Sequence, residues 1–518
     1  YSPGFTNQKP NEGQLISVDI SGYNPLLGES YTEMAAESRS MHKSQAMGSA
    51  KSRTARIDYL VHKAGEPATQ DLFDGVDLTW KRVKGGETVE PLVQQAIGSF
   101  RADNPAASLP ALATIYRALE KLDTTNPYVQ EKKQDVKNLI AECAGLWFET
   151  NPVDFAATPG EATKLNVSVV NRSKTAISLV AVNMPAVKRD TTLNLNLAYN
   201  TALVLPMTVT LPANQPLTQP YWLANPKEKG LFVVNDQKLI GNAENPPLLT
   251  TDYVFTLDGL TLTYTQPWIH KYVTAEDGEL YRAFEVRPVV TANLAEKVYV
   301  FADTKRTGEP DAGTAPKTVS LTLKSGRANV SGTARLQLPT GWSAEPAQIP
   351  FTLKQKFEEQ TISFSVKPTT VKTAESTLRA VMTVNGQAYT QSLVTIEHPH
   401  IRPQTLFPPA EAKLVKLDIR VKAKNIGYIA GAGDEIPAAL RQIGCTVTLL
   451  NEGDLQKDLS QYDAIVVGVR AYNTEDRLLM YQTKLMVYVE NGGTMLVQYQ
   501  TNRRLLTENM GPYPFKIT

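Results

Sequence analysis

The sequence is poor in cysteine, and its two cysteines, Cys143 and Cys445, lie far apart in the chain. Two distant thiols do not form a disulfide framework, so we expect each to be a small buried apolar side chain. No apolar run approaches the ~18 residues that span a bilayer, which predicts no transmembrane segment within these residues. Neither sign of charge dominates, because 53 Lys and Arg face 52 Asp and Glu. This balance argues against nucleic acid as a partner.

The chain also lacks a basic-then-apolar leader, and it opens on Tyr1 rather than on Met. We therefore expect an internal segment of a larger polypeptide. A length of 518 residues is too great for one hydrophobic core. At about 150 residues per domain, the length predicts three or four domains. Changes in the residue pattern along the chain divide it into the segments described below.

Residues 1–63 mix strand and helix patterns. An alternating run at 15–20 predicts a short strand. We expect a helix from Ser30 to about Gln45, with Ser30 as its N-cap and Glu33 completing a capping box. Residues 64–150 follow as a helical spacer, in which two amphipathic helices precede a third that has Asn126 as N-cap and Pro127 at its first position.

Near residue 151 the pattern changes to short runs in which apolar and polar residues alternate, with turn residues every ten positions or so. This pattern is typical of antiparallel strands with one buried face and predicts two β-sandwiches, at 151–287 and 288–400. The pair Gly341-Trp342 after a Leu-Pro strand end resembles the Ig-like modules of secreted bacterial enzymes.

Residues 398–413 are rich in proline and predict a linker. From 411 to 518 we expect an α/β domain with a parallel sheet, because strand and helix patterns alternate. The sequence stops before such a sheet is usually complete, so we expect this domain to be truncated. Its expected elements are strands at 426–430, 445–450, 463–469 and 494–498, and helices at 434–444 and 474–490.

One string carries a family resemblance. Ala35 and Ala36 are followed by His-Lys-Ser-Gln at 42–45, which resembles the closing helix of the LmbE/PIG-L family of N-deacetylases. The turn GYNPLLG at 22–28, the string DLFDGVD at 71–77 and the order of the later domains resemble large multidomain Bacteroidetes-type members. The resemblance covers essentially the whole chain, although only 1–63 corresponds to the deacetylase domain.

The resemblance implies the C-terminal part of a Rossmann-like α/β deacetylase domain that hydrolyses the acetamide of N-acetylglucosamine-type sugars. In the family, zinc polarises the carbonyl and an Asp acts as general base. The ligands come from an Ala-His-Pro-Asp-Asp-Glu motif and a later His, and this sequence holds neither. We therefore expect no catalytic residue and no metal ligand here. Arg39, His42, Ser44 and Gln45 are the candidates to line the pocket or support a ligand, unless His42 is a hydrogen-bonded core residue.

The five histidines are His42, His62, His270, His398 and His400, and none precedes Pro-Asp-Asp. We interpret His398-Pro399-His400 as a linker feature, because a zinc site normally needs at least three protein ligands. Tyr221-Trp222, Trp268 and Trp342 are either core residues or platforms for sugar rings.

The α/β end offers two further interpretations. Gly431-Ala432-Gly433 between strand and helix resembles a dinucleotide-binding turn, but position 436, where a third glycine belongs, is Ile, so a structural turn is preferred. The domain also resembles class I glutamine amidotransferases. Residues 499–501, where the nucleophile would stand, hold no Cys or Ser, which predicts a catalytically silent homologue.

The leading hypothesis is therefore part of a zinc-dependent carbohydrate N-deacetylase with Ig-like and amidotransferase-like modules. We expect a carbohydrate or glycoconjugate as substrate, and the resemblance implies a periplasmic or extracellular location. One alternative is a non-catalytic modular cell-surface or carbohydrate-binding scaffold. A third hypothesis makes the C-terminal α/β domain a hydrolase or nucleotide binder.

Overall fold

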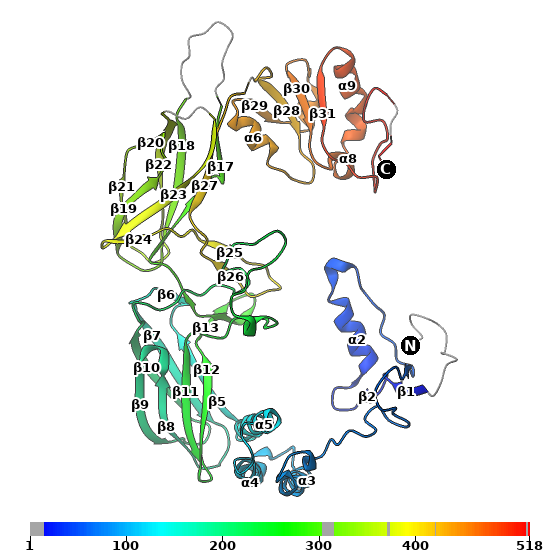
Figure 1. Ribbon diagram of the computed structural model, residues 1–518, viewed down its shortest axis with the longest axis vertical. Coiled ribbons are helices and arrows are strands. Elements are labelled where there is room, and N and C mark those ends of the chain that lie inside the picture. The colour runs from blue at the N-terminus through cyan, green and yellow to red at the C-terminus, as the bar shows by residue number, and fades with distance from the viewer. Residues whose placement is uncertain (1–14, 303–314, 370–372, 420, 514–515, 518) are drawn as a thin grey trace. The chain divides into compact units, whose positions relative to one another are not determined.

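The structure, a computed structural model, divides into two compact units, Tyr1–Leu146 with Arg172–Thr175, and Trp147–Asn171 with Ala176–Thr518. Strands hold 38% of the residues and helices 20%, so the protein is predominantly β (Figure 1). No helix among the described residues is long and apolar enough to cross a membrane. The described residues are 15–302, 315–369, 373–419, 421–513 and 516–517.

Unit 1 begins with a two-stranded antiparallel sheet of β1 (Leu15–Asp19) and β4 (Ile57–Val61). Between these strands lie a short hairpin, β2 (Tyr23–Asn24) with β3 (Glu29–Ser30), and the helix α2 (Tyr31–Ser40). The strand expected at 15–20 is thus confirmed.

The N-terminus of α2 has the expected capping box. The Ser30 side chain accepts from the Glu33 N–H, and the Glu33 carboxylate accepts from the Ser30 N–H. The expected C-terminal end is wrong, because α2 ends at Ser40 and Lys43–Gln45 form a separate 3₁₀ turn, η1. Ser40 and Ser49 pair instead, through a hydrogen bond from the Ser49 N–H to Ser40 Oγ.

The second part of unit 1 is helical, with α3 (Val89–Ser99), α4 (Leu109–Leu119) and α5 (Pro127–Cys143). Asn126 caps α5 as expected, because its side chain accepts from the Tyr128 N–H at 3.0 Å. Short 3₁₀ helices accompany them: η2 (Trp80–Arg82), η3 (Gly86–Thr88) and η4 (Pro105–Ser108). The helices enclose an apolar core of Trp80, Val83, Val89, Ile115, Leu119 and Val129.

Unit 2 opens with two antiparallel sheets. One has the order β10-β7-β5 and the other β12-β11-β8-β9. Their strands are β5 (Leu146–Pro152), β7 (Ala162–Asn171), β8 (Ile177–Met184), β9 (Arg189–Asn196), β10 (Ala202–Thr210), β11 (Thr250–Leu257) and β12 (Leu260–Pro267).

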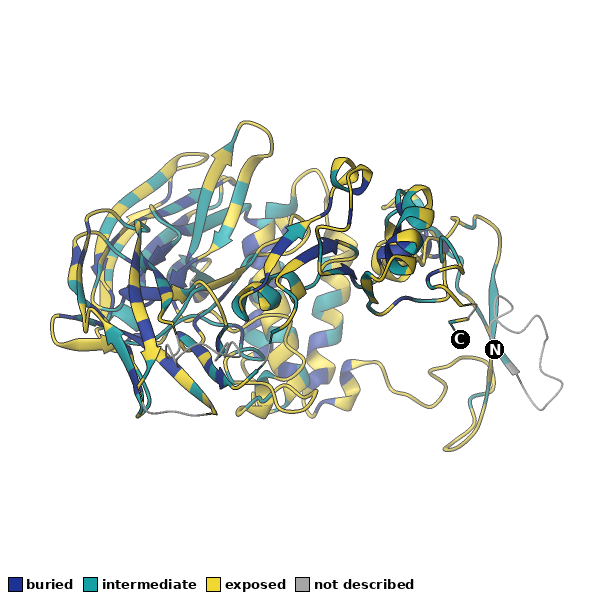
Figure 2. Cartoon of the chain, turned by 90° about the horizontal axis from the view of Figure 1, so that it is seen from above, coloured by how far each residue is buried: buried dark blue, intermediate teal, exposed yellow. Residues whose placement is uncertain are grey.

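These two sheets pack face to face around aromatic side chains. Phe148 from β5 lies 5.1 Å from Tyr253 and 5.4 Å from Phe255, both on β11, measured between ring centroids. Alternate residues of β7 are buried, as the period-two pattern predicted. Figure 2 shows buried and exposed residues alternating along several strands of the protein. Short elements flank this sandwich: β6 (Ala156–Ala157) pairs with β15 (Glu285–Val286), β13 (Ile269–Thr274) pairs with β14 (Gly278–Ala283), and the 3₁₀ helices are η5 (Pro185–Val187) and η6 (Gln237–Leu239).

A second pair of sheets follows, with orders β16-β18-β22-β20 and β17-β27-β23-β19-β21, and residues of both contribute to one buried apolar cluster. The strands are β16 (Val290–Leu294), β17 (Val298–Ala302), β18 (Lys317–Ser325), β19 (Val330–Gln337), β20 (Trp342–Glu345), β21 (Ile349–Leu353), β22 (Glu359–Pro368), β23 (Ala374–Val384), β24 (Gln387–Tyr389) and β27 (Glu411–Leu417).

Two expectations near residue 400 are wrong. The segment 398–413 is not a plain linker, because β25 (Val394–Ile396) pairs with β26 (Gln404–Leu406). The α/β domain does not begin at 411, because β27 lies between β17 and β23 in the second sandwich. β27 has a paired strand on each side, so its backbone N–H and C=O groups find their partners in the second sandwich. The proline-rich sequence before β27 does not reveal these partners.

The C-terminal part has a parallel sheet of order β29-β28-β30-β31, as the alternation of patterns predicted. Both faces are covered, since Ile465 and Val467 join one apolar cluster and Val466 joins another. The helix expected at 474–490 is present but begins later, at Leu478, and a separate short helix ends at Thr474. The elements are β28 (Asn425–Ile429), α6 (Ile436–Gln442), β29 (Thr446–Leu449), α7 (Glu452–Gln456), β30 (Ala464–Val467), α8 (Ala471–Thr474), α9 (Leu478–Glu490) and β31 (Thr494–Val497).

Candidate functional site

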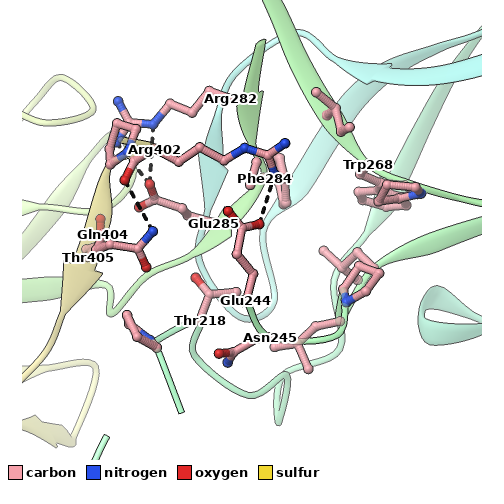
Figure 3. A pocket seen from close by; sticks show the side chains of 18 of the residues that line it. Thr218, Glu244, Asn245, Trp268, Arg282, Phe284, Glu285, Arg402, Gln404 and Thr405 are labelled. Carbon is pink, nitrogen blue, oxygen red and sulfur yellow. Dashed lines mark hydrogen bonds and ion pairs between the residues drawn. The ribbon is translucent and has the colours of Figure 1, made fainter. Parts of the chain in front are cut away.

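A pocket of about 300 Å³ lies within unit 2 (Figure 3). Five chain segments far apart in sequence line it: residues 218–220, 244–249, 267–269, 281–285 and 402–405. The first two belong to the long connection between β10 and β11. The next two are the ends of β12 and β14 with their neighbours, and the last leads into β26.

One side of the pocket is apolar. Trp268, which is 2% exposed, packs edge-to-face against Phe284 with ring centroids 5.6 Å apart. Pro246, Pro247 and Leu248 line the pocket with them. Trp268 is thus a core residue, which is the first of the two interpretations that the sequence allows. It also contributes to a wall of the pocket.

The other side of the pocket is polar and carries paired charges. Arg402 Nη1 lies 2.8 Å from Glu244 Oε2, and Figure 3 shows their side chains extending toward each other from different segments. Arg282 Nη2 lies 2.9 Å from Glu285 Oε1, while Arg287 Nη2 lies 2.7 Å from Glu285 Oε2. Each arginine is therefore anchored, which fixes the direction of its remaining N–H groups.

Side-chain amides fix the loops that form the pocket. Asn245 Oδ1 accepts from the Tyr221 N–H at 2.9 Å, and Asn245 Nδ2 donates to the Gln219 carbonyl at 2.6 Å. Gln219 Oε1 in turn accepts from the Phe407 N–H at 2.8 Å. These bonds connect three of the chain segments around the pocket, so its shape does not depend on apolar packing alone.

Thr405 is the unusual polar residue of this pocket. Thr405 is among the lining residues and is only 5% exposed, and its Oγ1, which is shielded from solvent, has no hydrogen-bond partner among the described residues. A buried hydroxyl is normally paired, because leaving it unpaired costs free energy.

The four candidate residues from the sequence lie elsewhere, in unit 1. Arg39 is in the last turn of α2, His42 precedes η1, and Ser44 and Gln45 lie in η1. All four are exposed, so the alternative that His42 is a buried core residue is wrong. The four lie within one segment, 39–45, at the junction of α2 and η1.

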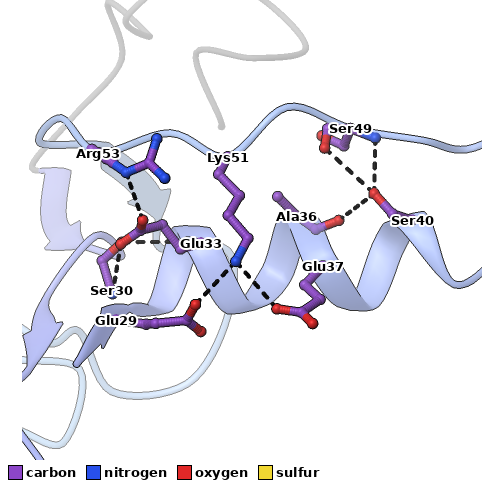
Figure 4. Close-up of polar contacts among 9 residues, drawn as sticks. All are labelled: Glu29, Ser30, Glu33, Ala36, Glu37, Ser40, Ser49, Lys51 and Arg53. Atoms are coloured by element: carbon purple, nitrogen blue, oxygen red, sulfur yellow. Dashed lines mark hydrogen bonds and ion pairs between the residues drawn. The ribbon is translucent and has the colours of Figure 1, made fainter. Parts of the chain in front are cut away.

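Ion pairs hold residues 51–53, which follow η1 in the chain, against α2 and its N-terminal end (Figure 4). Lys51 Nζ lies 3.0 Å from a Glu29 oxygen and 3.3 Å from a Glu37 oxygen. Arg53 Nε lies 2.8 Å from Glu33 Oε1, so Glu33 both caps the helix and anchors this segment. Hydrogen bonds from Ser30, together with the neighbouring cations, hold the pKa of Glu33 below its usual value.

The residues described by the structure include no group of three or more His, Cys, Asp and Glu side chains placed to hold a metal ion. His398 and His400 stack on each other with ring centroids 5.9 Å apart, and both are exposed. These residues do not fit the zinc ion that the family resemblance implies, so we derive no chemical step through a metal.

Two sequence features of the parallel-sheet domain have structural roles. Gly433 has φ +99°, and a Cβ on Gly431 would lie 2.3 Å from the Val469 carbonyl oxygen, so this turn requires glycine. Gln500, at the position considered for a nucleophile, is buried and accepts from the Tyr472 N–H at 2.9 Å. Burial raises the pKa of the Cys445 thiol, which makes it a poor nucleophile.

Sequence reasoning missed the pocket. Of its residues only Trp268 had been singled out, because the rest carry no motif and come from separate segments. The run Glu244-Asn245-Pro246-Pro247 was the one local signal, since clustered prolines in a long connection build a rigid wall.

Comparisons with known proteins give no family. No family model matches the sequence, and no curated protein matches it. A solved structure of the apo-form Calx CBD1 domain is similar at 11% identity over 25% of this chain and 98% of that one, with a TM-score of 0.16. The E. coli chaperone DraB is similar at 11% identity over 26% and 57%, with a TM-score of 0.15. E. coli alpha-2-macroglobulin is similar at 11% over 53% and 17%, with a TM-score of 0.17. None of these likenesses bears on function.

Proposed function

We propose that this chain is part of a zinc-dependent N-deacetylase of the LmbE/PIG-L type, and that the pocket of unit 2 binds its carbohydrate or glycoconjugate substrate. The support for the enzyme class is the string at 35–45 and the order of the domains. In this proposal the zinc ligands belong to residues outside this sequence, and the protein acts in the periplasm or outside the cell.

The observation that carries the binding role is the two-sided pocket. Sugar rings present an apolar face and a polar edge. Their binding sites combine apolar walls, which contact the face, with a few fixed polar groups, which bind the edge. Pro246, Pro247 and Leu248, which are exposed, provide the apolar wall, while Arg282 and Arg402 provide the polar groups. A pocket of about 300 Å³ is at the small end of ligand sites, which favours one or two sugar rings.

The finer architecture belongs to the same proposal. Residues 15–63 would complete a Rossmann-like deacetylase sheet, the two sandwiches would be Ig-like modules, and the parallel-sheet domain would be a silent amidotransferase-like module. The buried Gln500 at the nucleophile position supports a silent module. The alternative, a non-catalytic cell-surface scaffold, shares the pocket and differs only in lacking a catalytic domain.

The binding role is tested by titrating the full chain with N-acetylglucosamine tetrasaccharide in a calorimeter. Leu248→Ser changes a pocket residue that is 41% exposed, so we expect weaker binding without loss of folding. Leu231→Ser is the matched control, because Leu231 is 69% exposed and does not line the pocket. Absence of binding by the unmodified chain to this and other glycans would contradict the proposal.

The enzyme class is tested by sequencing the coding DNA upstream of Tyr1. An open frame with a signal peptide and a His-Pro-Asp-Asp motif would support the zinc deacetylase and its export together. An upstream domain without those ligands would favour the scaffold alternative.

A further inference from the structure

We infer that Tyr281 is the stacking platform of the pocket, whose aromatic ring contacts the apolar face of a bound pyranose. This inference deepens the glycan-binding role proposed above and rests on it. It starts from a difference among the three aromatic residues that line the pocket in the described part of the chain. Tyr281 is 57% exposed, whereas Trp268 is 2% and Phe284 8% exposed. Of these three, only Tyr281 leaves enough surface accessible for a ligand to contact.

Tyr281 lies on the face of the β13–β14 hairpin that borders the pocket. Ala283 lies two residues further along β14, and Ile269 is its partner on β13. Both residues line the same pocket as Tyr281. Because successive side chains of a strand alternate between its two faces, Tyr281, Ala283 and Ile269 project on one side of the hairpin. A strand, and not a loop, therefore places the ring at the pocket.

The hydroxyl end of Tyr281 is anchored. It donates a hydrogen bond to the Glu279 carboxylate, and this bond raises the pKa of the hydroxyl. Lys271 Nζ lies 3.8 Å from Glu279 Oε2 and 2.7 Å from Glu149 Oε1 on β5. The tyrosine is thus connected through Glu279 and Lys271 to a sheet of the first sandwich. A ring that is oriented before binding loses less rotational freedom when a ligand stacks on it.

A pyranose ring with equatorial substituents, such as β-linked N-acetylglucosamine, has a surface that fits this platform. Its axial C–H groups form an apolar face with a slight positive charge, which is attracted to the negative face of an aromatic ring. Its hydroxyl and amide groups lie at the ring edge, and Arg402 and Gln404 of the same pocket carry groups that can hydrogen-bond them. With Tyr281 as its aromatic surface, the pocket offers both parts of a sugar site.

The test measures the binding of N-acetylglucosamine tetrasaccharide to the full chain by calorimetry. We expect Tyr281→Ala to bind roughly tenfold more weakly, because the stacking contact is lost. Tyr281→Phe keeps the ring and should retain most of the affinity. In proton NMR spectra of the sugar, the axial ring protons should shift upfield on binding to the unmodified chain, because they lie over an aromatic ring. This shift should disappear with Tyr281→Ala, and a merely structural role of Tyr281 would not produce it.

Tyr272→Ala is the matched control. Tyr272 is 39% exposed, pairs with Leu280 on the opposite face of the same hairpin, and is not among the residues that line the pocket. This variant should change neither the affinity nor the shift.

Equal affinity of Tyr281→Ala and the unmodified chain would overturn the inference and leave the glycan-binding role standing. Equal weakening by Tyr281→Phe and Tyr281→Ala would assign the effect to the hydroxyl and also overturn the inference, as would a fall in both affinity and thermal stability for Tyr281→Ala. Failure of the unmodified chain to bind any glycan would overturn the glycan-binding role and this inference together.

Discussion

Trp268 Nε1 donates a hydrogen bond to Thr251 Oγ1 at 3.0 Å, and both residues are buried. The same Thr251 oxygen accepts from Thr150 Oγ1 at 2.7 Å, and Thr150 Oγ1 lies 2.7 Å from the Tyr253 hydroxyl. Burial raises the pKa of Tyr253, so this phenol stays protonated and can donate to Thr150. A pocket-lining tryptophan is thus fixed by a polar chain that runs through the core of the first sandwich.

Thr251→Val should destabilise the first sandwich. The substitution keeps the shape but leaves the Trp268 N–H and the Thr150 hydroxyl without their acceptor, which costs about 1–3 kcal/mol. Hydrogen exchange of the β11 and β12 amides in the full chain measures this loss. Thr261→Val on the exposed face of β12 should stay within about 0.5 kcal/mol. Equal effects of the two variants would show that the polar chain contributes nothing.

Alanine at the two glycines after β28 should have unequal effects. Gly433→Ala forces a residue with a side chain into φ +99° but meets no atom within 4 Å, and should cost about 1–3 kcal/mol. Gly431→Ala should cost more, because its Cβ would meet backbone atoms of Val469 and Ala471 at 2.3 and 2.7 Å. Exchange of the β28 and β30 amides measures both, and the reverse order would contradict the packing argument.

The parallel-sheet domain should lose stability in acid through Asp434. Burial raises the pKa of this carboxyl, but hydrogen bonds from the Tyr428 hydroxyl and from the Ile436 and Val469 N–H groups outweigh burial and lower it. A carboxyl whose pKa is lower in the folded state stabilises the fold above its unfolded pKa, and this stabilisation is lost as the pH falls through the folded value. The loss therefore falls below about pH 4.

Asp434→Asn should reduce protection of the β28 and β30 amides at pH 6 and should flatten the additional loss between pH 4 and pH 3. Asp476→Asn, at an exposed position, should behave like the unmodified chain. Hydrogen exchange of the full-length variants at matched pH gives the comparison. An acid response of the same size in Asp434→Asn would place its origin in another group.

Limited proteolysis should cut the N-terminal part of unit 1 first. The β1–β4 sheet has two strands, and two-stranded sheets are marginal on their own. Residues 41–50 between them are all exposed. We expect the first tryptic cuts between 46 and 84, with the strands between 150 and 400 resisting longer. Mass spectrometry of the digest over time measures the order of the cuts. Equal resistance of the two regions to trypsin would contradict this prediction.

The sequence was most informative where near neighbours determine structure. The capping box of Ser30 and Glu33 and the Asn126 cap before Pro127 were predicted residue by residue, because a helix end depends on groups within one turn. The alternation along β7 was predicted because a strand with one buried face imposes period two. The four parallel strands of the last domain were predicted for a similar reason, since continuous apolar runs separated by helices require a covered sheet.

The sequence by itself therefore determined the helix caps at Ser30 and Asn126, the buried face of β7 and the parallel sheet of the last domain. Only the tertiary structure decided that β27 belongs to the second sandwich, because strand pairing depends on partners as distant as β17 and β23. It also decided the pocket, where residues from 218 to 405 meet. Such contacts between distant segments leave no period and no motif in the sequence.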